Sequence, residues 1–157
     1  MSDTDPENRL IRALDESTQE YRRTQTLHEE ARDGVHAAIV AALKAQTPPA
    51  QVTAASPFKS AHVRRVARAH GIPAVTRGSD QAPLGPKASA ALKKLATATA
   101  DYEATRESFE EAQKGSRKAV AEALQADLAA TRVARHSPYS ETLVRDTADK
   151  LGIVLSR

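Results

Sequence analysis

Small and apolar residues recur at intervals of three and four over two long stretches of the chain, 7–46 and 87–127. This spacing places them on one face of an α-helix and is typical of helices that pack side by side. The stripes contain weak coiled-coil residues such as His28, which favours amphipathic helices packed on each other over an independent coiled coil. Because glycine is unfavourable inside a helix, Gly34 and Gly115 indicate a kink or a close helix approach.

Two shorter helices are predicted after the first long one. A helix over 49–55 ends before Pro57, because a residue that precedes proline avoids helical angles. Thr47 is expected to be the N-cap of this helix, with proline at its first position. A further helix over 60–70 carries apolar residues on one face, and Gly71 is expected to end it.

The same unit occurs twice in the chain. Shifted by 81 positions, the sequence matches itself without gaps, with 18 identities in the 54 pairs that begin at positions 21 and 102. A shared Ser-Pro-aromatic sequence and a shared Gly-Ile pair lie at fixed distances in both copies. We therefore predict an all-α fold of two tandem repeats related by a pseudo-twofold, with the long helices packed together. Repeat 1 spans 6–72, the linker rich in glycine and proline spans 73–86, and repeat 2 spans 87–157.

The linker leaves parallel and antiparallel packing of the long helices open. A helix of 40 residues is about 60 Å long, whereas the 16 residues from Gly71 to Pro86 extend over about 55 Å at most. An antiparallel pair is therefore the easier one to connect.

Composition narrows the class of protein further. Alanine accounts for 31 of 157 residues and aromatic residues for 3%, which suits closely packed helices better than a thick core. The absence of cysteine excludes disulfides, thiol catalysis and cysteine-ligated zinc. No apolar run approaches the roughly 20 residues of a membrane span, and the first five residues are acidic and lack the apolar stretch of a signal peptide. We expect a cytoplasmic protein that does not associate with membranes.

The sequence contains no pattern typical of an enzyme. No two of the five histidines are four residues apart, so a helical metal pair is not predicted. No serine stands in register with a histidine and a carboxylate, and no glycine-rich phosphate loop is present. We expect no catalytic activity, no cofactor and no metal.

The short helical segments resemble the DNA-binding helix-turn-helix superfamily over 49–68 and 130–149. Apolar residues occupy the positions that this superfamily requires: Val52, Phe58, Val63 and Val66 in repeat 1, and Val133, Tyr139 and Val144 in repeat 2. The sequence "ASPFxxxHVRRxAR…GI" is also similar to small helix-turn-helix proteins of actinobacteria and their phages. Pro57 and Pro138 depart from the usual turn glycine, so the turn must differ in detail.

The resemblance implies two classes of DNA contact. It places base readers at Ser60, Ala61 and Arg65 in repeat 1 and at Glu141, Thr142 and Asp146 in repeat 2. It places phosphate contacts at Lys59, His62, Arg64 and Arg68 in repeat 1 and at Ser140 and Arg145 in repeat 2.

The distribution of charge supports DNA as the partner and separates the two repeats. Six basic residues and no acidic ones lie between Asp33 and Asp80, whereas 125–157 contains five basic and four acidic residues. We therefore expect repeat 1 to supply most of the affinity, with repeat 2 reading a different half-site or serving as a packing partner.

The sequence predicts a double-stranded DNA-binding protein that acts as a single-chain pseudo-dimer, either a transcriptional regulator or a nucleoid-associated protein. A protein–protein interaction scaffold, bound through the long amphipathic helices, is the alternative. A homodimer formed through those helices also stays open.

Overall fold

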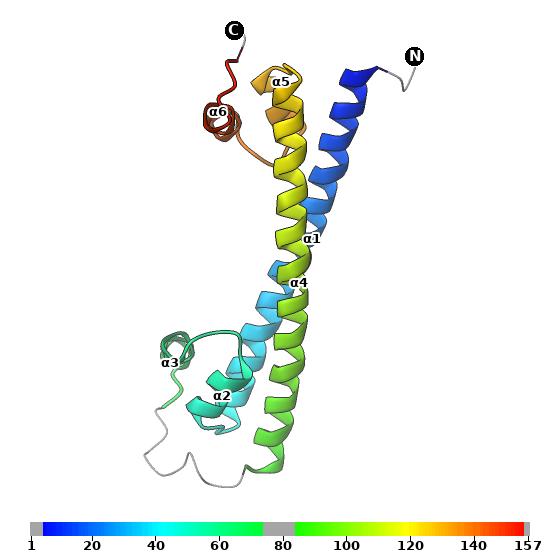
Figure 1. Cartoon of the computed structure of the whole chain (residues 1–157). Helices are drawn as coiled ribbons and strands as arrows, with labels where there is room; N and C mark the ends of the chain where they lie inside the picture. Colours follow the sequence, from blue (N-terminus) through cyan, green and yellow to red (C-terminus); the bar gives the residue numbers. More distant parts are fainter. Residues whose placement is uncertain (1–4, 74–83, 156–157) are drawn as a thin grey trace. The chain divides into compact units, whose positions relative to one another are not determined.

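The computed structural model describes residues 5–73 and 84–155, and each regular element in these ranges is an α-helix (Figure 1). The predicted all-α fold, with two long helices that pack together and are each followed by short ones, is confirmed. The predicted helix ends lie within two residues of the observed ones, and most of the predicted linker lies outside the described residues. The helices are α1 (Pro6–Lys44), α2 (Pro49–Ala55), α3 (Ser60–Ala69), α4 (Pro86–Gln125), α5 (Ala130–Arg135) and α6 (Glu141–Lys150).

The chain forms two compact units, and each unit takes residues from both repeats. The α2–α3 unit is residues 27–106, so it joins the second half of α1 to the first half of α4. The α5–α6 unit is residues 1–26 together with 107–157, which joins the remaining halves of the two long helices. Within each unit the α1 and α4 segments run antiparallel (Figure 1).

The core of the α2–α3 unit forms where four helices meet. Ile39 of α1, Val52 of α2, Val63 of α3 and Leu95 of α4 are all fully buried in one cluster. Nearer the N-terminus of α1, the His28 ring lies 4.8 Å from that of Tyr102 on α4, which fits its expected role in packing. The short helices are thus held by both long helices of their unit.

The α5–α6 unit has an equivalent core. Leu14 of α1, Val120 and Leu124 of α4, Val133 of α5 and Val144 of α6 form one buried cluster. Leu14, Val133 and Val144 stand 81 positions from Leu95, Val52 and Val63 of the other unit. The repeat in the sequence therefore corresponds to a repeat in side-chain packing.

A threonine hydrogen bond also recurs in both units. The Oγ1 of Thr99 on α4 donates to the carbonyl oxygen of Ala55 at the end of α2 over 2.7 Å. The Oγ1 of Thr18 on α1 donates to the carbonyl oxygen of His136, just after α5, over 2.8 Å. In each unit, the first short helix of one repeat is thereby fastened to the long helix of the other repeat.

The end of α1 corrects one prediction. Gln46 has a positive φ of 63°, and the Thr47 N–H donates to the carbonyl of Ala42 over 3.1 Å. This is the hydrogen bond that closes the C-terminal end of a helix. The prediction that Thr47 is the N-cap of α2 is therefore wrong; Pro48 occupies that position without a side-chain cap. Gly71, with a φ of 64°, ends α3 as predicted.

The mid-helix glycines do not mark a close helix approach. A Cβ added at Gly34 or at Gly115 would meet no other atom within 4 Å. Both residues are exposed, so the expectation of close backbone packing at these two positions is wrong. Within the described ranges, no helix combines the length and the apolar character needed to span a bilayer.

Candidate nucleic-acid interface

The interface predicted for repeat 1 is the outer face of α3. Val63 and Val66 turn inward to the core, because they are three residues apart on a helix that packs on one side. The remaining face is exposed and basic, with three arginines and no acidic residue in α3. The exposed candidates are Lys59, Ser60, Ala61, Arg64, Arg65 and Arg68.

The positive charge of this face is not compensated within the unit. The Nη2 of Arg64 donates a hydrogen bond to the Oγ of Ser60 over 3.3 Å, and this hydroxyl group carries no charge. No ion pair found in residues 5–73 and 84–155 involves Lys59, Arg64, Arg65 or Arg68. The basic groups of α3 are therefore available to an external anion.

His62 differs from the other candidates on α3, because it is only half-exposed. Its ring lies 4.4 Å from that of Phe58 and 5.1 Å from that of His36 on α1. Its Nε2 is buried and has no hydrogen-bond partner among the described residues. Burial lowers the pKa of His62, and the nearby His36, Arg65 and Arg32 lower it further. In this conformation the Nε2 is buried, so it is not the atom that could make the predicted phosphate contact.

The equivalent helix of repeat 2 has a different charge pattern. The Nε and Nη2 of Arg145 donate to one carboxylate oxygen of Glu141, over 3.0 and 2.7 Å. Ser140 caps α6, because its Oγ accepts a hydrogen bond from the Leu143 N–H over 3.3 Å. Of the two groups predicted to contact phosphate in repeat 2, Arg145 is thus already paired with a carboxylate, whereas the Ser140 hydroxyl accepts the cap bond and keeps its O–H as a donor.

The base-reading positions of repeat 2 are exposed, yet two of the three are acidic. Glu141, Thr142 and Asp146 lie on the outer face of α6. Asp146 and Asp149 stand where α3 has Arg65 and Arg68. In all, α6 contains three acidic and two basic residues. The outer faces of α3 and α6 are therefore opposite in the sign of their charge.

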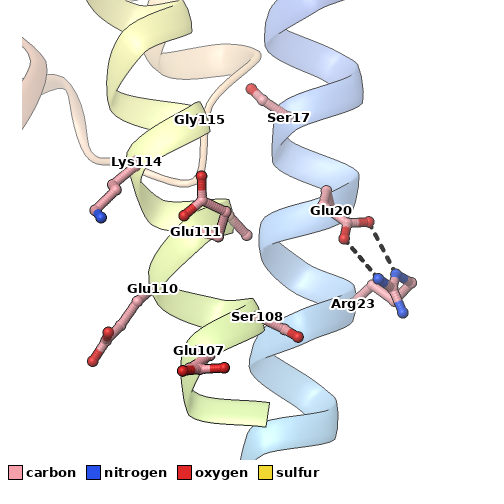
Figure 2. A pocket seen from close by; sticks show the side chains of 10 residues that line it. Ser17, Glu20, Arg23, Glu107, Ser108, Glu110, Glu111, Lys114 and Gly115 are labelled. Atoms are coloured by element: carbon pink, nitrogen blue, oxygen red, sulfur yellow. Dashed lines mark hydrogen bonds and ion pairs between the residues drawn. The ribbon is translucent and has the colours of Figure 1, made fainter. Parts of the chain in front are cut away.

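A polar cavity of about 720 Å³, which the sequence did not indicate, lies on the long helices of the α5–α6 unit. Figure 2 shows Glu20 and Arg23 of α1 joined by an ion pair, with Glu107, Glu110 and Glu111 projecting from α4. The hydrogen bond and charge of Arg23 lower the pKa of Glu20. Four carboxylates and two cations, Arg23 and Lys114, therefore line this cavity.

No group of three or more histidine, cysteine, aspartate or glutamate residues in the described ranges is placed to hold a metal ion. Comparisons of the chain with protein-family models, with curated proteins and with solved structures gave no match. The assignment of function therefore depends on the geometry and charge of the surfaces themselves.

Sequence reasoning missed Thr18 and Thr99, which fasten the first short helix of each unit. Both are threonine at positions 81 apart, as are the leucines Leu14 and Leu95. These identities lie before the matched window that begins at residue 21. Extending the self-comparison toward the N-terminus would have found them.

Proposed function

We propose that this chain binds double-stranded DNA, and that the outer face of α3 is its principal contact surface. The observation that carries the proposal is the uncompensated charge of α3, whose three arginines have no carboxylate partner among the described residues. A duplex presents closely spaced phosphates, and a protein that neutralises them gains affinity from the release of counterions. A short exposed helix that follows another short helix is also the shape that enters a major groove.

In this proposal, α6 contributes little to affinity. Arg145 already donates two hydrogen bonds to one oxygen of Glu141, and this carboxylate competes with a phosphate for it. Asp146 and Asp149 would repel the backbone from the positions at which α3 attracts it. The DNA contact is therefore asymmetric, although the two helices derive from one repeated sequence.

The test compares matched arginines in the two repeats. Binding of a fluorescent random duplex is measured by anisotropy at about 50 and about 200 mM salt. We expect Arg64→Ala to weaken binding about fivefold and to reduce the salt slope by about one, because one phosphate contact is lost. The matched control, Arg145→Ala, is expected to change binding less than twofold.

Two outcomes would contradict the proposal. Equal losses for the two variants would exclude the asymmetry, and no binding by the intact chain at low salt would exclude DNA as the partner. Circular dichroism of both variants verifies that each exposed substitution leaves the helices intact. Selection from random sites then separates a regulator, which enriches a sharp motif, from an architectural protein, which does not.

A protein-interaction scaffold is the second candidate function, and the acidic cavity of the α5–α6 unit favours it (Figure 2). A scaffold would bind a basic partner through Glu107, Glu110 and Glu111. Reversing the charge of Arg64 would leave such binding intact, whereas it would abolish the proposed DNA contact.

A further inference from the structure

A second cavity, of about 340 Å³, lies against α3 in the α2–α3 unit. It is bounded by the end of α1, the start of α2 and the segment that follows α3. Its apolar wall is formed by Leu43, Val63, Ala67 and Ile72. A volume of this size, lined mainly by apolar groups, is at the lower end of the range of small-molecule sites.

Two cations complete the lining of this cavity. Arg64 and Arg68 both line it, and they are one turn apart on α3, so they lie on the same side of the helix. Both are exposed, and neither forms an ion pair within the part of the chain that the structure describes. Guanidinium groups bind carboxylates through paired, charge-assisted hydrogen bonds. An apolar interior and a cationic border are thus combined in one site.

We propose that this cavity binds a small organic carboxylate with an apolar tail, such as a medium-chain fatty acid. The tail lies against the apolar wall, and the carboxylate is held by Arg64 and Arg68. A neutral apolar molecule would leave both guanidinium groups without a partner, whereas a free inorganic anion would make no contact with the partly exposed Ala67 and Ile72 of the apolar wall.

This ligand would also regulate the contact with DNA, a consequence that rests on the function proposed above. Arg64 and Arg68 are the same side chains that we expect to bind phosphates. A carboxylate that occupies them removes two positive charges from the outer face of α3. The bound ligand therefore weakens DNA binding.

The other repeat offers an internal control for the chemistry. Arg68 is replaced at the equivalent position by Asp149, and the equivalent of Arg64 is Arg145, which is already paired with Glu141. The corresponding place in the α5–α6 unit thus lacks an available pair of cations. Binding is expected at one site per chain.

The test titrates the intact chain with octanoate and follows the backbone amides by NMR. We expect saturable shifts at Ala67 and Ile72, with no comparable shifts at their equivalents, Ala148 and Ile153. Arg68→Asp, which copies the residue of repeat 2, should weaken octanoate binding at least tenfold. Octanol lacks the carboxylate and acetate lacks the apolar tail, so each should bind at least tenfold more weakly than octanoate.

Three results would overturn the proposal: no shifts at Ala67 and Ile72 with millimolar octanoate, equal binding by Arg68→Asp, or equal binding of acetate. A second variant, Ala67→Met, fills the cavity and retains both arginines, so it should also lose octanoate while keeping its helices. DNA binding without octanoate is measured separately, which distinguishes failure of the ligand site from failure of the DNA-binding function. If both hold, saturating octanoate should weaken DNA binding at least fivefold.

Discussion

At the scale of single residues, a neighbour four positions away decides what an arginine on the outer face can do. Arg64 has Ser60 as that neighbour, and Arg145 has Glu141. A hydroxyl orients a guanidinium without cancelling its charge, whereas a carboxylate does both. The exchange of serine for glutamate therefore gives Arg145 an internal charged partner that Arg64 lacks.

His62 gives a prediction for pH dependence. Its pKa is lowered in the folded protein, chiefly by burial, so the unfolded chain binds its proton more readily. The contribution of His62 to stability is complete above the unfolded pKa of about 6.5, and it is lost as the pH falls through that value toward the folded pKa. We expect the free energy of unfolding by urea to decrease between about pH 7 and about pH 5.

His62→Leu, which copies Leu143 of repeat 2, should reduce this decrease because it removes the group that gains the proton. The control is His70→Gln, at an exposed position just after α3. It should leave the decrease as in the original chain. An unchanged pH profile for His62→Leu would contradict the assignment.

At the scale of the helices, local signals in the sequence were sufficient for most of the fold. The apolar period and the stops at Pro57 and Gly71 predicted the helices to within two residues, because these signals act within one turn. Thr47 was misassigned because one residue can end a helix or cap the next one. The structure decides this through the backbone bond from Thr47 to Ala42.

The recurring threonine bond gives a prediction at this scale. Thr99→Val keeps the side-chain volume but leaves the partly buried Ala55 carbonyl without its donor. We expect a loss of about 1–3 kcal/mol in the free energy of unfolding, measured by urea denaturation. Thr97→Val is the matched control, because its exposed hydroxyl bonds only to the carbonyl of Lys93 in its own helix. A cost no greater than that of Thr97→Val would show that the bond does not fasten α2.

At the scale of the whole molecule, the duplication and the charge of α3 were predictable from the sequence, but the composition of the units was not. The self-match shows which residues are equivalent, yet it does not show which long helix covers which pair of short helices. That choice depends on packing between residues far apart in the chain, such as Ile39 and Leu95, which belong to one buried cluster. The inward orientation of the His62 ring was also not predictable from the sequence, because this ring lies against His36 of another helix. The ion pair between Arg145 and Glu141 could have been predicted from the sequence, because residues four apart on a helix are neighbours.

The division of each long helix between two units gives the last prediction. Neither repeat alone can complete a core, because the α2–α3 unit needs Leu95 and Thr99 of repeat 2, and the α5–α6 unit needs Leu14 and Thr18 of repeat 1.

A protease site inserted between residues 73 and 84 permits cleavage after folding. We expect the two fragments to elute together in size-exclusion chromatography, with unchanged helical circular dichroism, and to separate only in denaturant. A chain cleaved at a site inserted before Pro6 controls for the handling. Fragments that separate under native conditions would show that each repeat is independently folded. Fragments that stay together would show that the two repeats stabilise each other as the two subunits of an intertwined dimer do.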